Sequence, residues 1–264
     1  MGKDNFQAAV SAYNTGLDKI LESGDNWYSF LLTMGNNSRL PRAAQVAIWN
    51  TSPNAYWTMN EKQWARAGYA CEKERALTVP SGNSTVELFT SESVYPLDDS
   101  RPVPVWYFED DLTTEIAETL AKQFNLNIED KNNVLSVIKA YVSVYENVDD
   151  KINLFGMSLR DILLSRLGKN TMPSYGYSYD VSSLNRSSAQ ILIDRLNLVA
   201  RPFFDVVRTI AEKNQKSVSY TFDRGKTERY NLIEISEQEV PSNGEYLGQN
   251  NDGHRIRLHS SDVT

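Results

Sequence analysis

Apolar residues recur at spacings of three and four over most of the chain, which predicts a mainly helical protein. The first run covers residues 6–21 and consists of Phe6, Val10, Tyr13, Leu17 and Leu21. Gly24 follows this run at the place of a C-cap. Asp25 is then positioned to cap a second helix that carries Trp27 and Met34, and Gly35 is expected to end it.

Two shorter helices are predicted in the aromatic-rich segment that follows. Pro41 suits the first turn of a helix over residues 42–49, which the turn-rich NTSPN segment ends. Asn60 is a typical N-cap for the next helix, and Gly68 is a typical residue for its end.

Beyond residue 77 the pattern becomes typical of strands. TVELFT at residues 85–90 and PVPVWYF at 102–108 are rich in β-branched and aromatic residues, so we expect a small sheet near residues 77–108. A second pair of strand-like segments predicts a hairpin at residues 217–235, with its turn at Asp223-Arg224-Gly225.

Helical spacing dominates again between these strands. The patterns cover residues 116–124, 134–145, 155–167 and 187–213. Pro202 is expected to kink or divide the last of these helices. The fold class predicted is therefore α+β, mostly helical, with a small antiparallel sheet and a C-terminal hairpin. We expect an N-terminal domain at 1–112, a helical domain with the terminal hairpin at 113–235, and a poorly ordered polar tail at 236–264.

Composition is that of a soluble globular protein, with 41% hydrophobic and 23% charged residues in 264. No apolar run approaches the roughly 18 residues needed to span a bilayer, so no membrane partner is expected. The start of the chain lacks the layout of a signal peptide. Cys71 is the only cysteine, which excludes a disulfide framework within the chain and a zinc site built from cysteines. These features favour a cytoplasmic location.

Residues that carry common catalytic chemistry are scarce. The two histidines, His254 and His259, both fall in the expected tail. This spacing excludes an HExxH zinc site and disfavours a Ser-His-Asp or Cys-His site. The sequence contains no phosphate-binding P-loop motif, and no G-x-G-x-x-G motif follows a strand. We therefore expect a protein that is not an enzyme and that needs no cofactor.

The acidic run Glu109-Asp110-Asp111 is the one candidate for a metal site. Hard cations require several carboxylate oxygens that converge on one point. Successive side chains at the end of a strand point to opposite faces, so three consecutive acids do not converge. The run is better interpreted as a solvated strand end that caps the next helix, and no metal is expected.

Charge is unevenly distributed. The net charge of −7 argues against a protein that coats nucleic acid by bulk electrostatics. However, residues 26–75 contain six Lys and Arg against three Glu, whereas residues 87–118 contain nine acids and Arg101 alone as a base. A mildly basic, aromatic segment thus precedes an acidic one.

Four of the five tryptophans lie between Trp27 and Trp64, interleaved with basic residues. Aromatic rings that stack on bases, with cations that follow the phosphates, are typical of single-stranded nucleic-acid binding. The candidate binding residues are Arg39, Arg42, Trp49, Tyr56, Trp57, Lys62, Arg66 and Lys73. The alternative is that tryptophans on apolar helix faces fill a core, which is the commoner role for any one of them. Trp57 is the tryptophan expected to be the most accessible.

The same segment resembles the ArdC-type N-terminal domain. The residues that carry the resemblance lie in NWYSFLLTMG and in SRLPRAAQVAIWNTSPNAYWTMNEKQWARAGYACEKERALTV, and they are Pro41, Gln45, Ile48, Trp49, Pro53, Ala55 and Trp64. PVPVWYFEDDLT is similar to a strand of that domain. Two later segments, SLRDILLSRLG and residues 182–210, resemble the helical region that follows it in large Gram-positive mobile-element proteins with adenine methyltransferase and helicase modules. The resemblance covers residues 26–231.

The resemblance implies a non-catalytic protein of a phage or plasmid that binds nucleic acid, single-stranded DNA above all, as an antirestriction-type module. The chain departs from the family at ACEKERALTV, where a basic strand with glycine is usual, and it has neither a methyltransferase signature nor a helicase loop. Two alternatives stay open. One is a protein inhibitor of a host defence nuclease, a restriction or CRISPR effector, that binds through the acidic residues Glu109, Asp110 and Asp111. The other is an architectural N-terminal domain of a larger methyltransferase–helicase.

Overall fold

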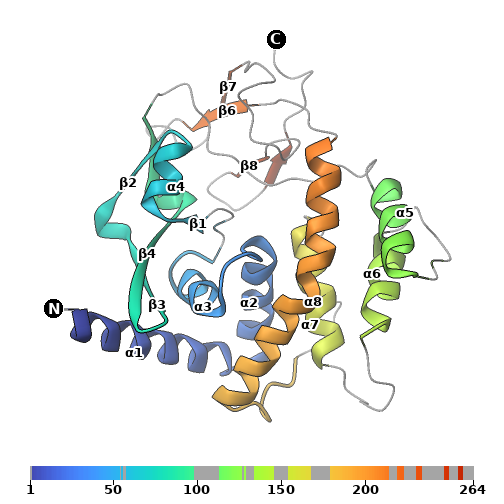
Figure 1. Cartoon of the computed structure of the whole chain (residues 1–264), viewed down its shortest axis with the longest axis horizontal. Helices are drawn as coiled ribbons and strands as arrows, with labels where there is room; N and C mark the ends of the chain where they lie inside the picture. Colours follow the sequence, from blue (N-terminus) through green and yellow to red (C-terminus); the bar gives the residue numbers. More distant parts are fainter. Residues whose placement is uncertain are drawn as a thin grey trace.

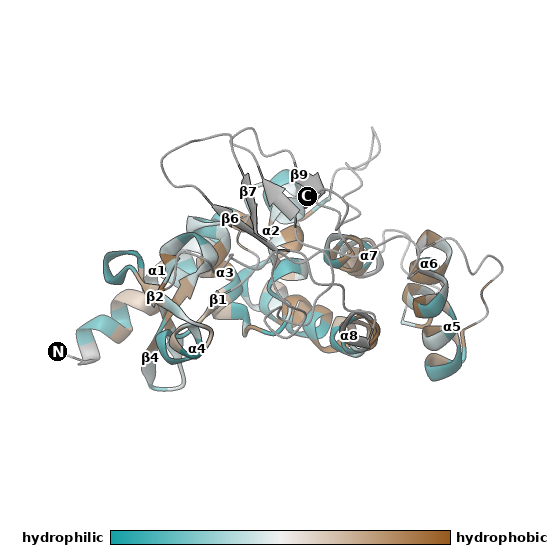
Figure 2. Ribbon diagram, turned by 90° about the horizontal axis from the view of Figure 1, so that it is seen from above, coloured by the Kyte–Doolittle hydropathy of each residue, from teal (hydrophilic) through white to brown (hydrophobic). Residues whose placement is uncertain are grey.

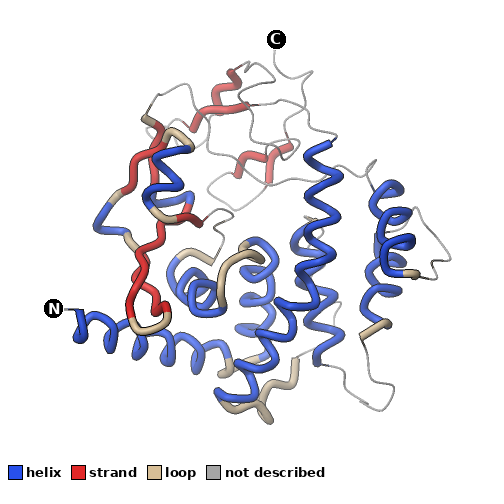
Figure 3. The backbone as a smooth tube through the Cα atoms, viewed as in Figure 1, coloured by secondary structure: helices blue, strands red, loops and turns tan. Residues whose placement is uncertain are grey.

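The structure of the chain is a computed structural model (Figure 1). It describes residues 2–53, 55, 58–97, 113–126, 128, 134–145, 154–167 and 179–213, and four short segments at 219–222, 230–233, 247–249 and 255–257. These residues form a mostly helical α+β fold with small antiparallel sheets, which confirms the fold class predicted from the sequence (Figure 3).

The helices follow the predicted segments closely. They are α1 (Gly2–Ile20), α2 (Gly24–Asn36), α3 (Arg42–Thr51), α4 (Glu61–Arg66), α5 (Thr113–Phe124), α6 (Val134–Ser143), α7 (Leu154–Arg166) and α8 (Arg186–Lys213). Two short 3-10 helices, η1 (Lys73–Arg75) and η2 (Ser91–Ser93), lie between strands. Pro202 lies inside α8, which continues past it as one helix, so the proline does not divide the helix. Within the described residues, no helix is long and apolar enough to cross a membrane.

The small sheet is antiparallel and has two parts. One has the strand order β1-β4-β3, from β1 (Thr58–Met59), β3 (Leu77–Ser81) and β4 (Ser84–Thr90). The other pairs β2 (Tyr69–Cys71) with β5 (Val94–Pro96). The sheet was predicted to begin near residue 77, but in the structure it begins at Thr58. The strands before residue 77 were not predicted because two or three residues are too few to show a period of two. The predicted strand at residues 102–108 lies outside the described residues.

Two further strand pairs belong to the C-terminal part. β6 (Ser219–Phe222) pairs with β7 (Tyr230–Ile233), with Phe222 opposite Tyr230, which confirms the predicted hairpin. The turn predicted at Asp223-Arg224-Gly225 lies outside the described residues. β8 (Leu247–Gln249) pairs with β9 (Arg255–Arg257) within the C-terminal segment 236–264.

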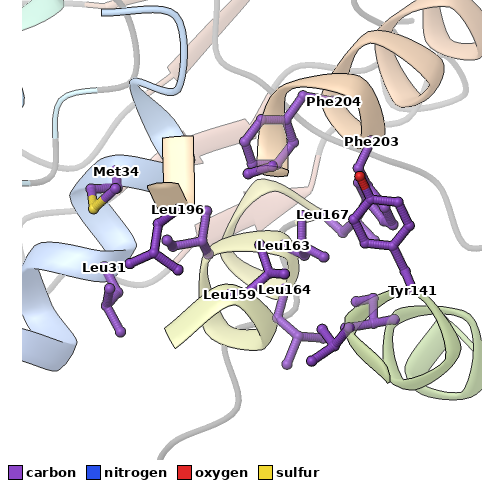
Figure 4. Close-up of a cluster of buried hydrophobic side chains, with 14 of the residues drawn as sticks. Leu31, Met34, Tyr141, Leu159, Leu163, Leu164, Leu167, Leu196, Phe203 and Phe204 are labelled. Carbon is purple, nitrogen blue, oxygen red and sulfur yellow. The ribbon is translucent and has the colours of Figure 1, made fainter. Parts of the chain in front are cut away.

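Helices from both sides of residue 112 share one main core. Figure 4 shows leucines of α7, among them Leu159 and Leu163, between Leu31 of α2, Leu196 of α8 and Tyr141 of α6. All five of these side chains are fully buried. Burying an aliphatic side chain contributes about 1.5–3 kcal/mol, so this cluster is the main source of stability.

Two glycines predicted to end helices have other roles. Gly24 is the first residue of α2, where Ser23 rather than Asp25 provides the N-cap: its Oγ accepts a hydrogen bond from the Asn26 N–H at 3.1 Å. Gly35 lies inside α2, where a Cβ atom would be 2.7 Å from the backbone oxygen of Ile162. Glycine at position 35 therefore allows the close approach of α2 and α7 and does not stop the helix.

A smaller core holds the sheet and α4 together. Trp64, Tyr69, Phe89 and Val94 are buried in it, and the Trp64 ring meets the Tyr69 ring edge-on with 5.4 Å between centroids. Nε1 of Trp64 also donates a hydrogen bond of 2.8 Å to the carbonyl of Phe89. We call residues 58–97 the small lobe.

Candidate nucleic-acid interface

Helix α4 presents two cations, Lys62 and Arg66, one turn apart on its exposed side. The helix is only six residues long, but its start is fixed by a capping box. The Gln63 N–H donates to Oδ1 of Asn60 at 2.9 Å, and the Asn60 N–H donates to Oε1 of Gln63 at 3.0 Å. The fully buried Trp64 fixes the opposite side of the helix. The two cations therefore project from a rigid base.

Lys62 and Arg66 form no ion pair with any residue that the structure describes, in contrast to the third predicted cation of this lobe. Lys73 forms an ion pair with Glu61, and its Nζ lies 5.7 Å from the centroid of the Phe89 ring. The hydrogen bond from Lys73 to Glu61 raises the pKa of the lysine. The charge of Lys73 is thus compensated within the protein.

Arg42 lies apart from α4, where α1, α3 and α8 meet. Its Nε donates to the hydroxyl of Tyr13 at 2.7 Å, and its Nη1 donates to the carbonyl of Gln190 at 3.0 Å and forms an ion pair with Asp194. Its side chain is only 25% exposed. Burial outweighs the nearby guanidinium and raises the pKa of Tyr13. These contacts give Arg42 a structural role, which the sequence did not predict.

Arg39 is also directed toward α8. It lies 3.7 Å from Asp205, whose carboxylate also binds Arg208 at 3.4 Å. The five described candidate cations thus fall into two groups: Lys62, Arg66 and Lys73 belong to the small lobe, whereas Arg39 and Arg42 bind acids of α8. The five cations therefore do not form one group around α4.

The described tryptophans of this segment pack into the protein. Trp27 and Trp64 are fully buried, which confirms the core interpretation for these two. Nε1 of Trp27 donates to Oγ of Ser158 at 2.9 Å. Trp49 is half-buried against the main core, and its Nε1 donates to Oγ of Ser29 at 3.2 Å. The predicted residues Tyr56, Trp57, Glu109, Asp110 and Asp111 lie outside the described residues.

A carboxamide pair that the sequence does not predict joins α3 to α8. Gln45 is fully buried and exchanges two hydrogen bonds of 2.9 Å with Asn197 of α8. Its Nε2 also donates to the carbonyl of Asn37 at 3.2 Å. The Asn37 side chain in turn donates to the carbonyl of Ala55 at 2.7 Å and accepts from Thr58 at 3.1 Å. The only signal in the sequence is a glutamine on an otherwise apolar helix face.

A second buried polar cluster joins α7 to the segment before α8. Asp161 is 3% exposed and accepts hydrogen bonds from the Tyr179 hydroxyl and from Nε of Arg160, the latter at 2.8 Å. The Tyr179 ring stacks on the Tyr28 ring, with 6.3 Å between centroids. Burial raises the pKa of Tyr179, so its hydroxyl remains protonated and acts as a donor. The cluster therefore anchors the chain between α7 and α8.

The small lobe carries charged residues of both signs. Its four cations are Lys62, Arg66, Lys73 and Arg75, and its five acids are Glu61, Glu72, Glu74, Glu87 and Glu92. Because Lys73 and Arg75 bind Glu61 and Glu72, the uncompensated positive charge of the lobe is concentrated at Lys62 and Arg66. No group of three or more His, Cys, Asp or Glu side chains able to hold a metal ion occurs in the part of the chain that the structure describes.

A comparison with models of protein families, with curated proteins and with solved structures finds no match to this chain. The ArdC-type resemblance therefore rests on its sequence motifs alone. In the structure, four of the residues that carry it (Gln45, Ile48, Ala55 and Trp64) are buried. These positions serve the packing of the fold.

Proposed function

We propose that this chain is a non-catalytic module that binds single-stranded nucleic acid through the exposed side of α4. The observation that carries the proposal is the pair Lys62 and Arg66, which are exposed, one turn apart, and not paired with any acid among the described residues. Cations that are fixed in position and uncompensated are the groups that displace counterions from phosphates.

The ion pairs of the other cations limit the affinity expected for nucleic acid. Arg39, Arg42 and Lys73 each have a carboxylate partner, so they contribute little net attraction for a phosphate. With a total charge of −7, the protein as a whole repels a polyanion. We therefore propose weak binding that is lost as the salt concentration rises. The ArdC-type motifs supply the biological part of the proposal, an antirestriction role in a phage or plasmid.

The test is a titration of a labelled single-stranded oligonucleotide, followed by fluorescence anisotropy at several salt concentrations. The double variant Lys62→Ala/Arg66→Ala is expected to lower affinity roughly tenfold or more at low salt, and to reduce the slope of log K against log salt by about 1.4 for two lost phosphate contacts. The matched control is Lys122→Ala/Lys139→Ala, which removes the same charge from exposed positions of α5 and α6. Equal losses in both variants, or no binding at low salt, would contradict the proposal.

A second candidate function is inhibition of a host defence nuclease through an acidic surface. It is favoured by the nine acids against one base in residues 87–118, of which Glu87, Glu92 and Glu118 are exposed in the structure. An acidic surface can occupy the basic groove of a nuclease by charge complementarity. Reversing the charges of Glu109, Asp110 and Asp111 should then abolish capture of restriction or CRISPR effectors. The α4 variant should leave that capture unchanged, which separates the two functions.

A further inference from the structure

Two aliphatic side chains on α8 are unusually exposed. Ile191 is 69% and Leu198 is 71% exposed, although most large apolar side chains of the helix belong to the main core. They lie seven residues apart, which places them two turns apart on the same side of the helix, about 10 Å from each other. Figure 2 views α8 nearly end-on, with α7 on one side and no other described helix on the opposite side.

The charges between these two residues are of opposite sign. Asp194 and Arg195 lie at the centre of the exposed stripe, and both are exposed. Asp194 binds Arg42 through Oδ2, and its side chain is 62% exposed. Cζ of Arg195 lies 4.3 Å from the centroid of the Phe155 ring, and this contact holds the stem of the arginine on the surface of α7. The stripe therefore has the order apolar, acid, base, apolar.

That order is complementary to itself in an antiparallel arrangement. A two-fold axis between positions 194 and 195 would place Ile191 against the partner's Leu198 and Asp194 against the partner's Arg195. Every apolar side chain then meets an apolar one, and every charge meets its opposite. Self-complementarity of a single patch is the requirement for a two-fold symmetric dimer. A parallel pairing in the same register would bring like charges together.

Asp194 of this stripe and Asn197 beside it are both held in place by other helices. Asn197 exchanges two hydrogen bonds with the buried Gln45, and Arg42 ties Asp194 to α1 and α3. A surface that is already ordered loses little conformational entropy on binding. From these observations we infer that the stripe Ile191, Asp194, Arg195 and Leu198 is the contact surface of an antiparallel homodimer. This inference is independent of the proposed nucleic-acid binding.

One helix face buries less area than a standard interface, which is about 1,600 Å². We therefore expect a dimer with a dissociation constant in the micromolar range. Sedimentation velocity of the full chain over low to high micromolar concentrations should show a concentration-dependent shift from monomer to dimer. A monomer at every concentration would overturn the inference.

Two sets of variants test the surface and its orientation. Leu198→Glu should raise the dissociation constant roughly tenfold or more because it places a charge in an apolar contact, whereas Leu135→Glu, at an exposed position of α6, should leave it unchanged. Arg195→Asp should also weaken the dimer, because it brings acids together. Arg195→Lys keeps the positive charge and leaves the Arg42–Asp194 pair intact, so it should leave the dimer unchanged. Thermal melts verify folding of each variant. A dimer insensitive to Leu198→Glu, or one that Arg195→Asp and Arg195→Lys affect equally, would refute this arrangement.

Discussion

The carboxamide of the fully buried Gln45 pairs through both of its polar atoms with that of the half-buried Asn197, at 2.9 Å in each direction. Polar groups taken from water into a core are tolerated only when their hydrogen bonds are replaced. Here the replacement also joins α3 to α8, two helices 152 residues apart in sequence. The pair therefore contributes specificity of packing as well as stability.

Replacing Gln45 with Ala is expected to lower the free energy of unfolding by about 2–3 kcal/mol. The reason is that the buried carbonyl of Asn37 and the half-buried amide of Asn197 lose their partner. Chemical denaturation measures the change. Gln123→Ala on the exposed side of α5 is the control and should alter stability little.

The double variant Gln45→Leu/Asn197→Leu distinguishes unsatisfied polar groups from lost packing. It removes both partners and fills the space, so it should be more stable than Gln45→Ala. A double variant less stable than the single one would show that the cost arises from shape and not from hydrogen bonds.

Helices α2 and α7 illustrate how one residue sets the distance between two elements. Gly35 faces the backbone of α7, where a Cβ would meet the Ile162 oxygen at 2.7 Å and Cβ of Ser165 at 2.8 Å. The Ser165 hydroxyl donates across the same contact to the carbonyl of Leu32 at 3.1 Å. The two helices lie as close as a glycine allows.

Gly35→Ala is expected to destabilise the protein by about 1–3 kcal/mol, because overpacking against rigid backbone outweighs the roughly 1 kcal/mol gain in helix propensity. Thermal or chemical unfolding followed by circular dichroism measures it. Ser11→Ala, on the exposed side of α1, should be neutral or slightly stabilising. Stabilisation by Gly35→Ala would mean that α2 and α7 can separate at little cost.

The whole molecule combines a large helical core with a smaller one. Fully buried residues from α1, α2, α3, α5, α6, α7 and α8 form the main core, whereas the small lobe has its own cluster around Trp64 and Phe89. A third cluster, Ala44 with Val79 and Leu88, attaches the sheet to α3. Stability is not uniform in such a structure, because a small cluster can open without the larger one.

Phe89→Ala should therefore act locally and Leu163→Ala globally. Each removes a fully buried side chain at a cost of about 2–5 kcal/mol. Hydrogen exchange should show faster exchange in β2, β4 and β5 but unchanged protection in α7 for Phe89→Ala. In Leu163→Ala, exchange should accelerate in α7 and α8. Uniform acceleration by both variants would show that the two cores unfold as one unit.

Most helices of this chain could be located from the sequence because each long pattern of apolar residues has a single way to bury its side chains. The segments predicted from Phe6, Ile116 and Phe155 all became helices, as did the helix capped by Asn60. The rule that glycine ends a helix failed at Gly24 and Gly35, because there the absence of a side chain allows close contact with a segment distant in sequence. The strands of two and three residues carried no readable period.

The candidate site was predictable only as a set of residue types. The sequence by itself determined that cations and tryptophans are interleaved between residues 27 and 73, and that the chain has two histidines and one cysteine. Only the tertiary structure decided that Arg42 binds Asp194 and that Lys62 and Arg66 stay unpaired among the described residues. Helix and strand periods depend on neighbours in sequence, whereas the pairing of a charge depends on which distant segment folds against it.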